Sequence, residues 1–208
     1  MRIFILGGSK GIGLCLTKLA LEKGYNVKVM SRNAESMPIV HKNLEKINGN
    51  GLELQKVEEA TENADVVIST IGTRSNKKNQ NLFSETTKNL LSAINGHNKL
   101  FISVTGIGVK DTYGKNGFLF DKIILPFLLK NIYKDKDIQE EIIKHCNTQW
   151  IIVRPGFLTN GPLTGRYKIV TDLTHLRTGK ISRMDVAHFI LSQIEDPVYL
   201  KMAPVITY

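Results

Sequence analysis

Cysteine is scarce in this chain of 208 residues, which contains only Cys15 and Cys146. Both lie in stretches with a helical pattern, so we interpret them as small apolar side chains rather than as a disulfide or a metal-ligand pair. A chain of this length with 42% hydrophobic residues can bury a full core without cross-links. The cysteine content therefore predicts a protein of a reducing compartment.

Long hydrophobic runs are also missing. The most apolar stretch, residues 118–129, is too short to span a bilayer and is interrupted by Asp121, Lys122 and Pro126. We expect this stretch to be core, a lid or a dimer contact. Because an apolar strand begins at Arg2, we expect no targeting segment, no membrane partner, and a cytoplasmic protein that is a monomer or a homodimer.

Motifs for metals and nucleic acids are absent as well. The five histidines show no metal-ligand spacing, so we expect no metal site. The net charge of +9 would suit a polyanionic partner, but the lysines and arginines are scattered. No helix-turn-helix, zinc or RNP pattern accompanies them, so we expect no nucleic-acid partner. An anionic cofactor accounts for the charge.

What the chain does contain is a glycine-rich turn near its start. The apolar strand 2–6 leads into Gly7-Gly8-Ser9-Lys10-Gly11-Ile12-Gly13 and then into a helical pattern. Glycine permits φ > 0, and a helix N-terminus offers free N–H groups and partial positive charge to a phosphate. The Lys-(Ser/Thr) ending of a P-loop is missing, so the pattern indicates a dinucleotide rather than ATP or GTP.

The type of dinucleotide is indicated by the end of the second predicted strand. An NAD site normally places a carboxylate there, but residues 26–30 are followed by Ser31 and Arg32. A guanidinium matches a phosphate, and Lys10 in the glycine-rich turn adds a second positive charge. These residues favour NADPH over NADH.

Strand and helix patterns alternate along the whole chain, which predicts an α/β fold with a doubly wound parallel sheet of the Rossmann type. The predicted strands are 2–6, 26–30, 44–47, 65–72, 99–104, 149–153, 166–170 and 205–208, and the predicted helices after the first are 52–63, 82–95, 136–146 and 183–195. We expect one domain over residues 1–208, with a small substrate lobe built from about 106–132 and 156–182.

Ligands of such sheets bind at the carboxyl ends of the strands. The residues expected to bind the cofactor are Gly7, Gly8, Ser9, Lys10, Gly11, Ile12, Gly13, Ser31, Arg32, Asn50, Thr70, Ile71, Gly72, Ser103, Val104, Lys136, Pro155, Gly156 and Phe157.

Several motifs in order resemble the short-chain dehydrogenases/reductases, in particular the atypical NmrA-like, NAD(P)H-binding group. They are the GxxxGxG turn, residues 64–68 followed by Gly72, the strand that ends in Arg154-Pro155-Gly156, and Ile181-Ser182-Arg183 leading into Asp185. Residues 161–167 are similar to a stretch of the biliverdin reductase B type of NADPH-dependent flavin reductase. The resemblance implies a Rossmann fold and a nicotinamide cofactor.

The expected catalytic residues of that family are not all present in this sequence. Typical members protonate a carbonyl with a Tyr four residues before a Lys, but Ile132 holds that place before Lys136. We expect Tyr133, one residue further along, to be rotated by about 100° away from the site. Without this acid, a ketone is a poor substrate, whereas a planar conjugated acceptor delocalises the incoming charge.

We therefore predict an NADPH-dependent oxidoreductase that reduces a flavin, a quinone or a linear tetrapyrrole. Ser103, Thr105 and Lys136 are the predicted catalytic residues. The alternative is a non-catalytic NADP(H)-binding redox sensor of the NmrA type, which the missing Tyr would favour.

Overall fold

A computed structural model describes residues 1–73, 81–118 and 120–208 of the chain. Its main sheet has the strand order β3-β2-β1-β4-β5-β6-β10-β8. All strands of this sheet run parallel except β8, which pairs antiparallel with β10 at the edge. The order reverses direction at β1, between β2 and β4, as in a doubly wound Rossmann sheet. The predicted fold class is confirmed.

The elements follow the alternation of the sequence closely. The strands are β1 (Arg2–Leu6), β2 (Asn26–Ser31), β3 (Leu44–Asn48), β4 (Val66–Ser69), β5 (Leu100–Val104), β6 (Gln149–Pro155), β7 (Phe157–Thr159), β8 (Lys168–Val170), β9 (Lys180–Ser182) and β10 (Val205–Thr207). The α-helices are α1 (Gly11–Glu22), α2 (Leu54–Thr61), α3 (Leu82–Ala93), α4 (Lys130–Lys144) and α5 (Arg183–Glu195).

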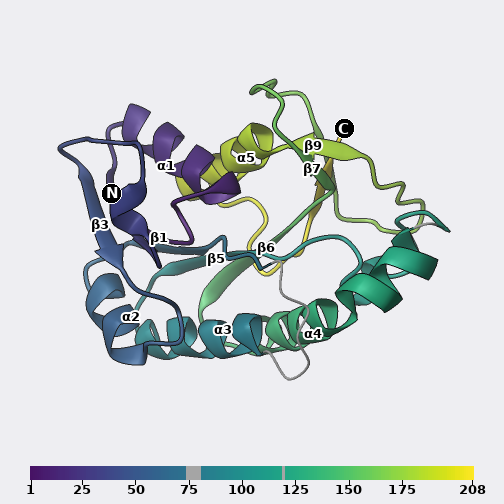
Figure 1. The fold of residues 1–208 in the computed structure, drawn as a ribbon, viewed down its shortest axis with the longest axis horizontal. Coiled ribbons are helices and arrows are strands. Elements are labelled where there is room, and N and C mark those ends of the chain that lie inside the picture. The colour runs from purple at the N-terminus through teal and green to yellow at the C-terminus, as the bar shows by residue number, and fades with distance from the viewer. Residues whose placement is uncertain (74–80, 119) are drawn as a thin grey trace.

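Helices cover both faces of the sheet (Figure 1). Helices α1 and α5 pack together on one face, and α2, α3 and α4 line the other. Side chains that alternate along β1 supply both layers, because Ile5 packs on the α1–α5 side and Phe4 on the opposite side. All four residues of β4 are buried, which explains why this strand reads as a continuous apolar run.

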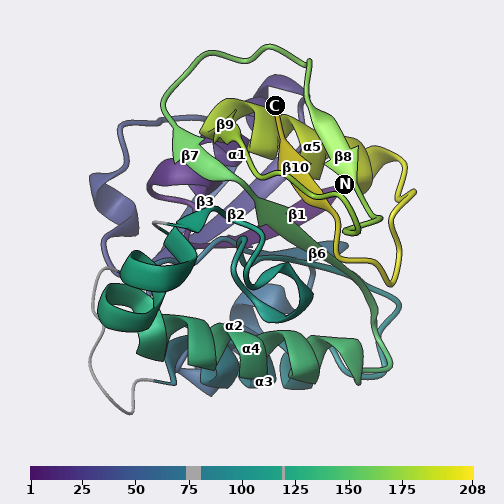
Figure 2. The same ribbon diagram turned by 90° about the vertical axis from the view of Figure 1, so that its right-hand side faces the viewer.

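Two short strands were not predicted. β7 and β9 form a separate parallel pair beside the end of the main sheet (Figure 2). The loop after β5 contacts the segment before β9, since Lys115 Nζ donates a hydrogen bond to the Leu173 carbonyl and Thr178 Oγ1 donates one to the Lys115 carbonyl. Three residues carry little alternation from which to predict a strand, although β8 and β10, which are equally short, lie within predicted strands.

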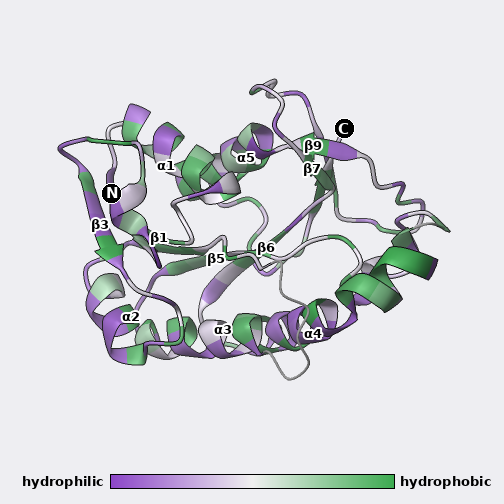
Figure 3. Ribbon diagram, in the orientation of Figure 1, coloured by the Kyte–Doolittle hydropathy of each residue, from purple (hydrophilic) through white to green (hydrophobic). Residues whose placement is uncertain are grey.

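Residues 120–129 of the apolar stretch are helical. Phe120–Leu129 forms a wide π-helical segment, η3, which continues directly into α4 (Figure 3). Helix α4 therefore begins at Lys130 rather than at Lys136 as predicted. Pro126 lies inside η3 and obscures its helical pattern, because proline supplies no N–H to the helix ladder. No helix among the described residues is long and apolar enough to cross a membrane.

Candidate functional site

The glycine-rich turn is built so tightly that side chains are excluded. Gly7 and Gly11 have φ of +88° and +59°, which disfavours any other residue. A Cβ on Gly13 would lie 2.4 Å from the Gly7 carbonyl oxygen and 2.4 Å from Thr70 Oγ1, and one on Gly8 would lie 2.8 Å from the Val29 side chain. The first turn of α1 is thus packed against the ends of β1 and β4.

The N-terminus of α1 is open to an anion. Its cap residue, the exposed Lys10, makes no side-chain capping hydrogen bond, and the first turn contains no acidic residue. Arg183, the first residue of α5, places Nε 3.8 Å from where a Cβ on Gly11 would lie, and its Nη1 donates to Asn160 Oδ1 at 2.7 Å. The sequence prediction missed Arg183, although the Ile181-Ser182-Arg183 motif was noted.

The end of β2 suits a phosphate on the ribose. Ser31 Oγ is buried and has no hydrogen-bond partner in the described residues. The side chain of Arg32 next to it is exposed, and within the described ranges it forms no ion pair. An orphaned hydroxyl and an unpaired guanidinium are groups that a 2′-phosphate would satisfy.

Other residues predicted to bind the cofactor differ in how closely they approach the glycine-rich turn. Thr70 Oγ1 donates to the Leu6 carbonyl at 3.1 Å and so joins the end of β4 to the end of β1, just before the glycine-rich turn, while a Cβ on Gly72 would meet nothing within 4 Å. The side chain of Asn50 is engaged locally, because its Nδ2 donates to Glu53 Oε1 at 2.5 Å. Asn50 therefore stabilises the turn before α2.

The three predicted catalytic residues meet at the end of β5. Lys136 Nζ donates to the Thr105 carbonyl oxygen at 2.5 Å, and Thr105 Oγ1 donates to Glu140 Oε1 at 2.7 Å. Ser103 is fully buried, and its Oγ accepts a hydrogen bond from Gln139 Nε2 at 3.1 Å. One face of α4 thus fixes all three positions.

Burial lowers the pKa of Lys136 to about 8, although the charges of Glu140 and Asp135 raise it in part. The ammonium lies 5.0 Å from the centre of the Phe83 ring, which favours the charged form only weakly. Lys136 therefore changes its charge close to neutral pH.

Tyr133 is not turned away from the site, so the prediction from the family spacing was wrong. Its hydroxyl lies 3.9 Å, and Lys136 Nζ 3.8 Å, from where a Cβ on Gly106 would lie, directly after the end of β5. Residues three apart on a helix share a face just as residues four apart do. Burial and the charge of Asp121 raise the pKa of Tyr133 to about 12, so the phenol keeps its proton.

A buried ion pair that the sequence did not reveal lies behind these residues. Arg154 Nε and Nη2 donate to the two carboxylate oxygens of Glu140, at 3.0 and 2.5 Å, and both side chains are fully buried. Arg154 Nη1 also lies 2.7 Å from Asp111 Oδ1. The network holds β6, α4 and the loop after β5 together, and it orients Thr105.

Aromatic rings border the site on the side of η3. The Phe120 ring packs edge-on against Phe157 at 5.2 Å and against Tyr133 at 6.1 Å between centroids. Pro155 is a buried residue of β6, and Gly156 lies so close to Gly179 that a Cβ would come within 2.5 Å of its carbonyl oxygen. Phe157 is half-exposed and is thus the predicted residue of this strand end that remains accessible.

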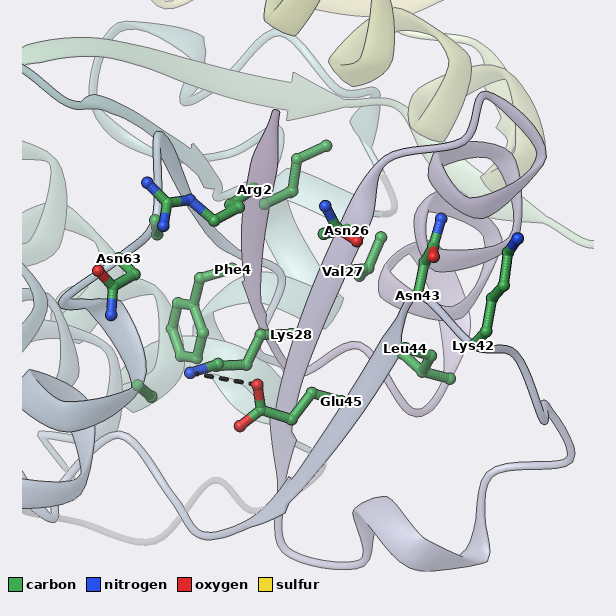
Figure 4. A pocket seen from close by; sticks show the side chains of 13 residues that line it. Arg2, Phe4, Asn26, Val27, Lys28, Lys42, Asn43, Leu44, Glu45 and Asn63 are labelled. Carbon is green, nitrogen blue, oxygen red and sulfur yellow. Dashed lines mark ion pairs between the residues drawn. The ribbon is translucent and has the colours of Figure 1, made fainter.

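One hollow of the surface lies away from this site. A hollow of about 440 Å³ lies at the opposite, amino-terminal end of β1 and β2 (Figure 4). Its wall contains the ion pair of Lys28 and Glu45, 3.3 Å apart. Within the described residues, no group of three or more histidines, cysteines or acidic residues could hold a metal ion.

Residues 7–197 match a family model described as NAD(P)H-binding. The chain belongs to this NAD(P)H-binding family. The region matched begins at Gly7 and includes the glycine-rich turn, the end of β5 and α4. Part of the chain, 77 residues, is also 35% identical to an uncharacterized oxidoreductase of Schizosaccharomyces pombe, over 34% of this chain and 26% of that protein.

Several solved structures share the fold over the whole chain. A short-chain dehydrogenase/reductase from Veillonella parvula, in complex with NADP, superposes with a TM-score of 0.85 at 18% identity, covering 100% of this chain and 94% of that one. The anaerobillin reductase ChuY from Escherichia coli O157:H7 has a TM-score of 0.82 at 20% identity, covering 100% and 97%. A candidate NADH-flavin reductase from Streptococcus pneumoniae has 0.79 at 20%, covering 100% and 99%.

Proposed function

We propose that this NAD(P)H-binding protein is an NADPH-dependent reductase of planar conjugated acceptors such as flavins, quinones or linear tetrapyrroles. The observation that carries the assignment as a reductase is the placement of Tyr133 and Lys136 together beside Gly106, at the end of β5, because this pair supplies the proton donor that the family spacing did not predict. The half-exposed Phe157 and its partner Phe120 border this position with aromatic surface. NADPH, when bound, supplies the hydride.

Residues of the chain bind the phosphate groups of NADPH. The turn from Gly7 to Gly13 binds the pyrophosphate with backbone N–H groups, and Arg183 adds positive charge beside it. Ser31 and Arg32 bind the 2′-phosphate. Lys10, which was predicted to bind the cofactor and whose exposed side chain precedes α1, belongs to this turn.

At the reacting end, Tyr133 donates its phenolic proton to a heteroatom of the acceptor as the acceptor is reduced. The high pKa of Tyr133 keeps the phenol protonated beforehand. The ammonium of Lys136 lies 5.7 Å from the centre of the Tyr133 ring and stabilises the negative charge that the transfer leaves on the oxygen. Ser103 and Thr105 are held by Gln139 and Glu140 and line the nicotinamide position.

The preference for planar acceptors rests on the aromatic border of the site and on the neighbours in fold. Flavins and linear tetrapyrroles are both extended conjugated systems, and a candidate flavin reductase and an anaerobillin reductase both superpose over the whole chain. A flat acceptor stacks on aromatic rings and is oriented for hydride transfer without a deep substrate lobe.

Reversing the charge of Arg32 tests the choice of cofactor. We expect Arg32→Glu to weaken NADPH binding about 100-fold, since a charge-assisted contact contributes about 1.5–3 kcal/mol and the new carboxylate repels the phosphate. NADH, which lacks the 2′-phosphate, should lose less than about threefold. Calorimetry with both cofactors measures this, with Lys18→Glu on the exposed side of α1 as the matched control. Equal losses for NADPH and NADH would contradict the assignment of Arg32.

The pKa of Lys136 predicts how turnover depends on pH. Because this pKa is lowered to about 8, the ammonium is present below pH 8 and lost above it. We expect kcat/KM for acceptor reduction to fall about tenfold between pH 7 and pH 9. In Lys136→Met the rate should be low and without this fall, whereas Lys136→Arg should keep the rate and move the fall to higher pH. A fall near pH 8 that persists in Lys136→Met would assign it to another group.

A further inference from the structure

Segment η3 presents an exposed apolar face at the edge of the molecule. Phe127, Leu128 and Ile123 are 76%, 62% and 46% exposed, and Phe118 just before the segment is 78% exposed. Figure 3 shows η3 as a strongly hydrophobic ribbon that projects from the body of the protein. Scattered exposed apolar residues are ordinary on a protein surface, but four within one short segment are not.

The apolar residues gather on one side because the other side of η3 is anchored. In a helix with i→i+5 hydrogen bonds, residues four and five apart lie on the same side, as Ile123 does with Phe127 and Leu128. The opposite side holds Phe120, which is buried against Phe157, and Asp121, which accepts hydrogen bonds from Asn116 N at 2.8 Å and Nδ2 at 3.0 Å. The outer face is therefore fixed in position.

Positive charge accompanies this face. Lys122, Lys130 and Lys134 are exposed within and directly after η3, and in the part of the chain that the structure describes none of them forms an ion pair. Asp121 and Asp135 are buried and engaged in hydrogen bonds, and the half-buried Asp137 accepts a hydrogen bond from Lys110 N. The chain as a whole carries a net charge of +9.

We infer that the outer face of η3, formed by Phe118, Ile123, Phe127 and Leu128 with the three lysines, docks on an anionic lipid surface. Apolar side chains flanked by lysines are the composition with which helices lie in a membrane interface. A two-fold contact with a second copy would gather the lysines of both copies in one interface, which charge repulsion opposes. The protein would lie on the bilayer through this face, which differs from the expectation of no membrane partner.

The docked orientation would bring the site next to the membrane. Phe120, on the inner side of η3, contacts Tyr133 and Phe157, both at the proposed acceptor position. Docking itself does not depend on the proposed function, since it rests on surface residues outside the cofactor site. If the proposed function holds as well, an apolar acceptor such as a quinone could be taken up from the lipid.

Vesicle flotation tests the inference with the whole chain. We expect the protein to float with phosphatidylcholine vesicles that contain phosphatidylglycerol, to remain behind with phosphatidylcholine alone, and to be released as salt is raised. The paired changes Phe127→Ser with Leu128→Ser, and Lys122→Glu with Lys130→Glu, should each lower the bound fraction at least tenfold. These side chains are exposed, and thermal unfolding checks that each variant remains folded.

Two controls match the variants. Val40→Ser removes an apolar side chain that is 98% exposed at another place, and Lys18→Glu with Lys42→Glu makes the same change in net charge. Both should float like the unchanged protein. The inference is overturned if the protein does not bind anionic vesicles, if the controls lose binding equally, or if the Phe127/Leu128 pair abolishes a dimer seen by sedimentation while vesicle binding is unchanged.

Discussion

Gly13→Ala is expected to lower the affinity for NADPH about 100-fold. The new methyl group would lie 2.4 Å from the Gly7 carbonyl oxygen and from Thr70 Oγ1, so α1 must move away from the ends of β1 and β4. Overpacking of this kind costs about 1–3 kcal/mol, and a loss of about 2.8 kcal/mol in binding free energy corresponds to a 100-fold loss of affinity. Calorimetry with NADPH measures the loss.

The matched control is Gly161→Ala. Gly161 has no positive φ, and a Cβ there would find its nearest neighbour, Ser182 Cβ, at an ordinary 3.5 Å. Its affinity for NADPH should stay within about twofold of the unchanged protein. If Gly13→Ala, shown to be folded by its thermal unfolding, binds NADPH as tightly as Gly161→Ala does, the phosphate loop is assigned wrongly.

Glu140→Gln is expected to lower the free energy of unfolding by about 3–5 kcal/mol, because it leaves the Arg154 guanidinium buried without a full counter-charge. The Glu140 carboxylate accepts from Arg154 Nε and Nη2 and from Thr105 Oγ1. Urea unfolding measures the change. The same substitution in the exposed pair of Lys88 and Glu85, Glu85→Gln, should cost less than about 1 kcal/mol.

Thr105 links this pair to the proposed reaction. When Glu140 becomes glutamine, the hydrogen bond from the Thr105 hydroxyl to this side chain is weakened. We therefore expect reduction of the planar substrate to slow even where the protein is still folded. Equal effects of Glu140→Gln and Glu85→Gln on unfolding would show that the buried pair does not hold β6 and α4 together.

Features encoded by neighbouring residues were predictable from the sequence. The strand 2–6, the turn from Gly7 to Gly13 and the helix 183–195 follow from local apolar periodicity and from the φ that glycine allows. Parallel strands bring their carboxyl ends to one edge, and this rule predicted Ser103 and Thr105 as site residues at the end of β5, where the structure also brings Lys136 to the Thr105 carbonyl.

The remainder depends on contacts between distant segments. Arg183 approaches Gly11 only because α5 packs against α1, and Arg154 meets Glu140 only because β6 lies under α4. Tyr133 was misplaced for a different reason, since a single family spacing was applied where helix geometry allows two. Helix η3 was not predicted because Pro126 lies inside it, and a proline in a sequence normally indicates the end of a helix.

The central claim is that NADPH is a reactant here, and the most direct measurement follows loss of the nicotinamide absorbance of NADPH with riboflavin, FMN, a quinone and biliverdin as acceptors. Calorimetry on the same sample measures NADPH binding. The account predicts turnover with at least one planar acceptor, slowed by Tyr133→Phe. Tight NADPH binding without oxidation by any of the four acceptors would contradict it and would favour a redox sensor that binds NADPH without consuming it.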